Sequence, residues 1–140
     1  MGIRISGPLV SLTAIGAGIG GAVTNAATAH TLSTGKRAVI KKIMWRNNSL
    51  TNGFLLVGYG DRTVAGSLFR QVLPSILMLA GIDGEMSELD IPNGGNTPEG
   101  FQTDTTAVTG TVGNILVETD AAGVGAIPAN VQVKIEVDES

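Results

Sequence analysis

The chain has 140 residues, of which 43% are hydrophobic and 15% are charged, with a formal net charge of −3 and no cysteine. This length suits one domain with a single core and excludes two independent ones, and the missing cysteines exclude disulfides and thiolate metal sites. The nine Lys and Arg are spread too thinly to form a phosphate-binding surface, so we expect no direct binding of nucleic acid.

The charged share is also low compared with the roughly 25% of a typical soluble domain. Two explanations are open. Either Gly, Thr and Asn supply an uncharged polar surface, or part of the surface is buried against partners, because the centres of interfaces are depleted of charged residues.

Residues 1–35 are predicted to form an extended N-terminal arm, because no formal charge lies between Arg4 and Lys36 if His30 is neutral. Its many Gly and Ala bury too little area to fold alone, but they allow a close approach to another surface. The uncharged stretch 9–29 is too rich in Gly, Thr, Ser and Asn to span a membrane. The candidate interface residues of this arm are Leu9, Leu12, Ile15, Ile19, Val23 and His30.

From residue 36 onward the pattern is typical of short β-strands. Residues 38–46 are rich in Val and Ile, and they end at Asn47-Asn48-Ser49. Asn52-Gly53 is a turn dipeptide before the next apolar run, 54–59, so the two runs are predicted to form a hairpin with a long loop. The second run is apolar at consecutive positions, which indicates a strand covered on both faces.

The middle of the chain is harder to assign. Segments 69–73 and 76–80 flank Pro74, and we interpret them as strands, with a helix over 67–79 as the alternative that this proline would interrupt. Asp83-Gly84 indicates a turn, residues 88–92 a short strand, and residues 93–98 a loop.

The last two predicted strands are 108–119 and 130–138. Residues 130–138 alternate between apolar and polar side chains, the pattern of a strand with one buried face. In all, about seven to eight short strands separated by Gly, Pro and Asn predict an all-β fold, an antiparallel β-sandwich or jelly roll over residues 36–140.

Most motifs fit structural explanations better than functional ones. Residues 16–21 match the G-x-G-x-x-G pattern, but no acidic residue follows at the spacing of a dinucleotide site. Asn47-Asn48-Ser49 is a glycosylation sequon. The acidic group Asp83, Glu85, Glu88 and Asp90 could supply oxygen ligands to calcium, but its spacing is not that of an EF-hand and a solvated loop edge is favoured. We therefore expect no cofactor and no metal.

Candidate catalytic residues are equally few. His30 is the sole histidine and has no acidic neighbour in the sequence, so a nucleophilic triad would have to be assembled entirely by the fold. Trp45 and Tyr59 could stack a sugar or a base, but their strand positions beside Ile43 and Val57 favour a core role. We expect no catalytic site, and hence no enzyme.

Residues 36–61 and the later Leu89-Asp90-Ile91-Pro92 resemble small β-sandwich structural proteins of bacterial or archaeal viruses. This resemblance extends over residues 30–138 and lies in the general sequence pattern, without a diagnostic motif. It implies a capsid or capsid-decoration subunit located in the virion, a trimer or higher homo-oligomer that also contacts other capsid proteins through its arm.

Two other classes of function remain open. One is an extracellular filament subunit in which residues 9–25 add a strand to the sheet of the next subunit. The other is a carbohydrate-binding module that uses Trp45, Tyr59 and the acidic loop. An open-ended polymer would indicate the first, and a monodisperse monomer that binds glycans would indicate the second.

Overall fold

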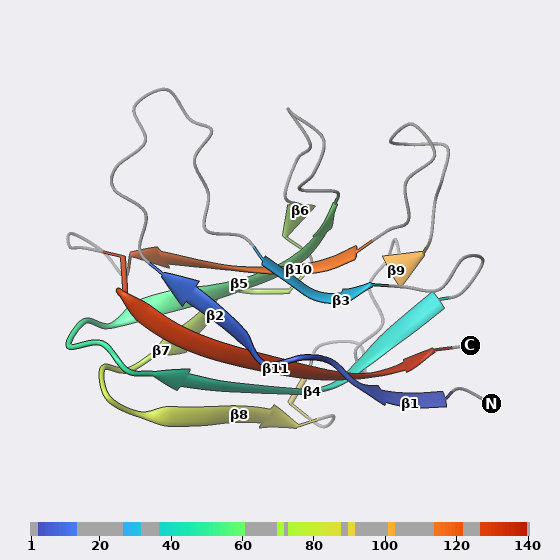
Figure 1. Cartoon of the computed structure of the whole chain (residues 1–140), viewed down its shortest axis with the longest axis horizontal. Helices are drawn as coiled ribbons and strands as arrows, with labels where there is room; N and C mark the ends of the chain where they lie inside the picture. Colours follow the sequence, from blue (N-terminus) through green and yellow to red (C-terminus); the bar gives the residue numbers. More distant parts are fainter. Residues whose placement is uncertain are drawn as a thin grey trace.

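A computed structural model describes residues 3–13, 27–31, 37–60, 70–71, 73–87, 90–91, 101–102, 114–121 and 127–139. The regular structure of these residues is entirely β, and their strands form two antiparallel sheets that lie one over the other (Figure 1). The all-β prediction is confirmed, and the arrangement is that of a β-sandwich. The finer assignment as a jelly roll stays a prediction.

The first sheet, which we call sheet A, is built around the last strand of the chain. Strand β11 has β4 on one side, and β1 and β2 both pair with it; β4 pairs in turn with β8 and β9. The bounds of these strands are Ile3–Ser6 for β1, Val10–Thr13 for β2, Arg37–Asn47 for β4, Asp83–Ser87 for β8, Phe101–Gln102 for β9 and Asn130–Glu139 for β11.

The second sheet, sheet B, has β10 and β5 at its centre. β10 pairs with β3 on one side and with β5 on the other, and β5 also pairs with the short strands β6 and β7. The bounds are Ala27–Thr31 for β3, Gly53–Gly60 for β5, Arg70–Gln71 for β6, Ile76–Met78 for β7 and Asn114–Ala121 for β10.

Strand β11 supplies the largest continuous part of the core. Val131, Val133, Ile135 and Val137 are fully buried, whereas the residues between them face outward and are partly exposed. The alternation read from the sequence is therefore confirmed. Each buried side chain of this kind contributes about 2 kcal/mol of transfer free energy, so this one strand accounts for much of the attraction between the sheets.

Strand β4 changes its buried face part-way along. Lys42 pairs with Glu136 and Ile40 pairs with Val137, so Lys41 is an extra residue that forms a β-bulge. Even-numbered residues, such as Ile40, point into the core before the bulge, and odd-numbered residues, such as Ile43, do so after it. The bulge lets a strand without simple alternation keep one apolar face.

The predicted hairpin of residues 38–59 is wrong. Both strands exist, but β4 lies in sheet A and β5 in sheet B, so residues 48–52 cross from one sheet to the other. A hairpin would have placed both apolar runs side by side in one sheet. The crossing instead makes them face each other through the core, which buries more apolar surface.

Two local assignments in the middle of the chain also differ. Asp83 and Gly84 begin β8 rather than forming a turn; the turn lies just before, at Ala80 and Gly81, where Gly81 has a φ of 71°. Such a backbone conformation is accessible to glycine without steric cost. Within the predicted strand 88–92, the described residues Asp90 and Ile91 form a turn and a bend. The alternative helix over residues 67–79 is wrong, because the described part of this segment contains the strands β6 and β7.

The predicted boundary at residue 35 does not separate the described strands. β1 and β2 pair with β11, and β3 pairs with β10, so both sheets include residues from the predicted arm. Leu12 and Ala29 belong to the shared core. Whether residues outside these strands extend to neighbouring subunits stays a prediction.

Candidate interaction site

Two loops present exposed apolar side chains at the same end of the sandwich. Residues 48–52 connect β4 to β5, and residues 79–82 connect β7 to β8; they lie together because Asn47 N–H donates to Ile82 O and Ala80 N–H donates to Asn52 Oδ1. Both loops are at the left of Figure 1. The apolar end patch comprises Leu50, which is 99% exposed, Leu79 and Ile82 of the second loop, and Leu77 of the preceding strand β7; the last three are each about half exposed.

A buried asparagine holds the first of these loops in shape. The Asn47 side chain donates to Thr51 O at 2.8 Å and accepts from Ser49 N–H at 3.0 Å and from the Ser49 hydroxyl at 2.6 Å. Asn47 is fully buried, so these bonds replace water completely. Leu50 therefore extends from a loop with a defined conformation, which lowers the entropy cost of binding a partner.

The burial of Asn47 also makes it a poor glycosylation site in the folded chain. Glycosylation needs an accessible Asn amide, whereas the Asn47 amide is fully buried and donates to Thr51 O and, at 3.4 Å, to Met78 O. In the folded chain, the Asn and Ser of this pattern therefore stabilise the loop through their hydrogen bonds and do not carry a glycan.

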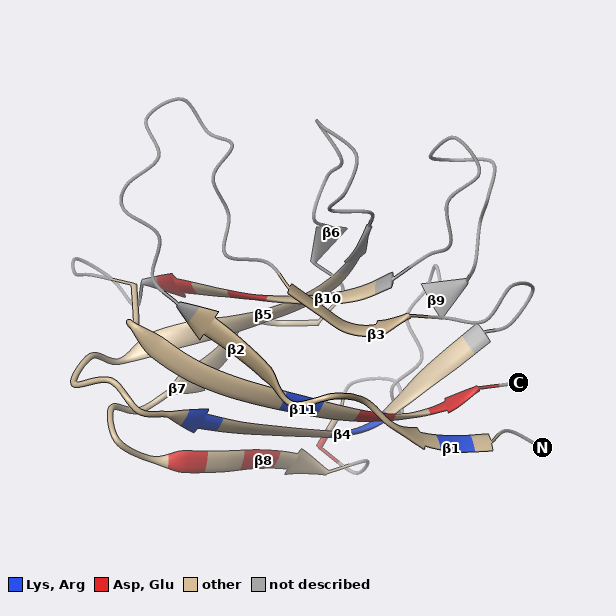
Figure 2. Cartoon of the chain, viewed as in Figure 1, with Lys and Arg blue, Asp and Glu red and all other residues tan. Residues whose placement is uncertain are grey.

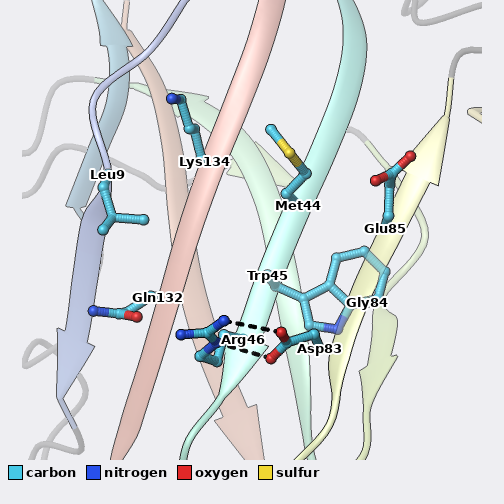
Figure 3. Close-up of a pocket in the computed structure, with 9 residues that line it drawn as sticks. All are labelled: Leu9, Met44, Trp45, Arg46, Asp83, Gly84, Glu85, Gln132 and Lys134. Carbon is cyan, nitrogen blue, oxygen red and sulfur yellow. Dashed lines mark hydrogen bonds and ion pairs between the residues drawn. The ribbon is translucent and has the colours of Figure 1, made fainter.

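The outer face of sheet A carries a second feature, an open groove of about 430 Å³ across β11, β4 and β8 (Figure 3). It lies close to the apolar end patch, because Asp83 directly follows the second loop and Arg46 is separated from the first loop only by Asn47. Met44 lies between Lys134 and Glu85 in this groove (Figure 3). The residues that line it are Leu9, Met44, Trp45, Arg46, Asp83, Gly84, Glu85, Gln132 and Lys134.

The charges on this face are arranged in cross-strand pairs, and both signs are interspersed (Figure 2). Arg46 binds Asp83 through two hydrogen bonds, of 2.9 and 3.1 Å. The hydrogen bond from Arg46 holds the pKa of the Asp83 carboxyl below its usual value and raises the pKa of Arg46 itself. Further pairs join Lys42 to Glu85 at 3.5 Å and Arg4 to Asp138 at 2.6 Å.

The structure distributes the candidate interface residues over different environments. Leu9 is 61% exposed and borders the groove, whereas Leu12 is 1% exposed and lies in the core of its own chain. His30 is also buried. Ile15, Ile19 and Val23 lie outside the described residues, so their role, like that of the set as a whole, stays a prediction.

His30 connects the two sheets instead of lying on a free surface. It belongs to β3 of sheet B, and its Nε2 is 3.0 Å from Oε1 of Glu139 in β11 of sheet A; each side chain is only 7% exposed. Nothing in the sequence near His30 indicates this partner, because the two residues are 109 positions apart.

The acidic residues near β8 do not converge on one point. Asp83 binds Arg46 and Glu85 binds Lys42, while Asp90 accepts hydrogen bonds from the backbone and hydroxyl of Ser87. Among the described residues, no group of three or more His, Cys, Asp or Glu could hold a metal ion. Glu88 lies outside them.

Trp45 packs against the core, as expected from its strand position, and its ring lies against Gly84 of β8. The Tyr59 side chain and residues 16–21 of the glycine motif lie outside the described part of the chain.

The described residues contain no helix that is long and apolar enough to span a membrane. Comparison with known proteins gives no matching family model and no matching curated sequence.

Proposed function

We propose that this chain is a non-enzymatic structural subunit that assembles with copies of itself and with other capsid proteins in a virus particle. The apolar end patch carries the proposal. Large exposed apolar side chains gathered on adjoining loops are uncommon on soluble monomers, and they mark surfaces that are covered by a partner. Leu50, at 99% exposure on a loop held by Asn47, offers its apolar side chain to a partner at a low cost in loop entropy.

Two further observations support an assembly role. The low charged share of the sequence fits a surface that is partly buried between subunits. The described fold is a two-sheet sandwich, consistent with the resemblance to small virion proteins that the sequence suggests. The choice of a virion over other assemblies rests on that resemblance.

The test is the mass of the purified, tag-free chain in solution by light scattering, combined with electron microscopy of the same sample. We expect trimers or larger closed particles. Leu50→Ser should reduce the assembly mass while leaving the free energy of unfolding within about 0.5 kcal/mol, because this side chain contacts little of its own chain. Ile3→Ser, at a residue that is 71% exposed on β1 near the other end of the sandwich, is the matched control.

The possible outcomes separate the alternatives. Closed particles that shrink with Leu50→Ser but not with Ile3→Ser support the proposal. Open-ended fibres would favour the filament subunit instead. A stable monomer at all concentrations would refute self-assembly, and binding of that monomer to a glycan array would favour the carbohydrate-binding module.

A further inference from the structure

We infer that strand β8 is a docking edge for an extended segment of a partner protein, in which apolar side chains alternate with Lys or Arg. The segment adds one strand to sheet A through backbone hydrogen bonds to β8. The inference goes beyond the proposed function, because it concerns the lateral edge of the sheet and not the apolar end patch. It requires neither self-assembly nor a virus particle.

The backbone of β8 has one side without a neighbouring strand. Among the described strands, β8 pairs with β4 alone, at the edge of sheet A (Figure 1). Asn47 N–H donates to Ile82 O, and residues of antiparallel strands alternate between bonded and non-bonded pairs. The register therefore turns the N–H and C=O of Gly84 toward β4 and those of Asp83 and Glu85 away from it. These outward groups are a short ladder that is open to a further strand.

The inner side of this edge leaves part of the core uncovered. Trp45 and Met86 pack against the core but stay partly exposed. The Trp45 ring reaches β8 and lies so close to Gly84 that a Cβ at this glycine would collide with it (Figure 3). Met86 follows Gly84 by two residues, so it faces the same side of the sheet. A strand beside β8 with an apolar side chain at every second position would cover both Trp45 and Met86.

The outer side of the edge determines the charge of the docking segment. The side chains of Asp83 and Glu85 are 61% and 53% exposed, and β8 contains no Lys or Arg. Their partners Arg46 and Lys42 belong to β4, which lies one strand further from the edge. An added strand lies about 4.8 Å from β8, so its outward side chains meet the two carboxylates first. Lys or Arg at these positions forms favourable cross-strand pairs.

The same charges argue against a second copy as the occupant. Two β8 edges in antiparallel pairing would bring the carboxylates of Asp83 and Glu85 from both copies side by side. Like charges on neighbouring strands destabilise a sheet. The edge is therefore complementary to a basic segment and not to itself.

The probe is a short capped peptide in which Lys and Val alternate, added to the full chain. Trp45 is the only tryptophan of the chain and the peptide has none, so a fluorescence change with peptide concentration measures binding near β8. Hydrogen exchange locates the contact, because exchange of the Asp83 and Glu85 N–H should become slower while that of Gly84 stays as it is. A peptide of alternating Glu and Val should bind about tenfold or more weakly, because it places like charges beside β8.

Two substitutions of Glu85 separate the backbone contact from the charge. Glu85→Pro removes the outward N–H without removing a hydrogen bond between β4 and β8, a position at which an edge strand tolerates proline. We expect it to weaken binding of the Lys/Val peptide about tenfold or more, since a hydrogen bond and close approach are both lost. Glu85→Gln is the matched control, which keeps the N–H and should weaken binding by no more than about fivefold.

Thermal unfolding establishes that each variant is folded. If Glu85→Pro does not fold, a fully N-methylated Lys/Val peptide takes its place in the comparison. This peptide keeps the charges but has no backbone donors, so it should not bind by strand addition.

Binding that is lost with Glu85→Pro or with N-methylation, together with slower exchange at Asp83 and Glu85, supports the inference. Absence of binding, equal binding of the Glu/Val peptide, or equal binding by the Pro and Gln variants overturns it. Fibres or dimers of the unmodified chain that Glu85→Pro dissolves would identify a second copy as the occupant and overturn it as well. None of these results depends on Leu50, so the inference and the proposed function can fail separately.

Discussion

His30 and Glu139 form a buried pair that joins the two sheets, with His30 Nε2 and Glu139 Oε1 3.0 Å apart and each side chain 7% exposed. The pair lies where β3 of sheet B meets the last residue of β11 in sheet A. Removing one member of a buried pair takes a polar contact away from the other in a low-dielectric environment, which is costly.

We therefore expect His30→Leu to lower the free energy of unfolding by about 3 kcal/mol, measured by urea denaturation. The double variant His30→Leu/Glu139→Leu should recover a large part of this loss, because both polar side chains of the buried pair are then replaced by apolar ones. A double variant as unstable as the sum of the two single changes would show that the pair does not act as a unit.

Asn47→Ala should destabilise the chain by about 2–4 kcal/mol, since it removes four hydrogen bonds and leaves the buried Ser49 N–H without its acceptor. Asn48→Ala is the matched control at the neighbouring, exposed position, and it should change stability by no more than about 0.5 kcal/mol. Equal effects of the two substitutions would contradict the role assigned to the Asn47 network.

Gly84→Ala should destabilise by about 1–3 kcal/mol, because a Cβ at this position would meet the Trp45 ring. The cost should fall when Trp45 is first replaced by Leu, which makes room for the methyl group. Trp45 is the only tryptophan of the chain, so a change in its fluorescence reports the shift of the ring directly. An equal cost of Gly84→Ala in both backgrounds would argue against this contact.

Leu9 and Leu12 should respond differently to truncation, although the sequence suggests the same role for both. Leu12→Ala should cost about 3 kcal/mol, because its side chain is 1% exposed in the core, whereas Leu9→Ala should cost less than about 0.5 kcal/mol at 61% exposure. Chemical denaturation of both variants checks this. Similar stabilities would place Leu12 outside the core, as expected of a detached arm.

The Arg46–Asp83 pair predicts a dependence on acid pH. Arg46 lowers the pKa of Asp83 through their hydrogen bond. A carboxyl group whose pKa is lower in the folded state stabilises that state above its unfolded pKa, and this stabilisation is lost as the pH falls through the folded pKa. An NMR titration should give Asp83 a midpoint below that of an ordinary Asp, and Arg46→Gln should move it back. An unchanged midpoint would show that the pair does not persist in solution.

Several strands could be predicted from the sequence because their own residues contain the necessary pattern. In β11, buried Val and Ile alternate with outward polar residues, and this two-residue period is a property of any extended strand with one covered face. The core role of Trp45 followed from its neighbours in the same strand. The exposed Leu50 and the groove could not be predicted, since exposure depends on what other segments cover.

The sequence by itself determined the all-β character and the positions of the long strands, because local alternation and turn residues act within a few positions of one another. Only the tertiary structure decided that β4 and β5 lie in different sheets, that a bulge at Lys41 keeps one face of β4 apolar, and that His30 meets Glu139. These features depend on contacts between segments far apart in the chain. Such contacts form because burying apolar surface between the sheets outweighs the local preference for a hairpin.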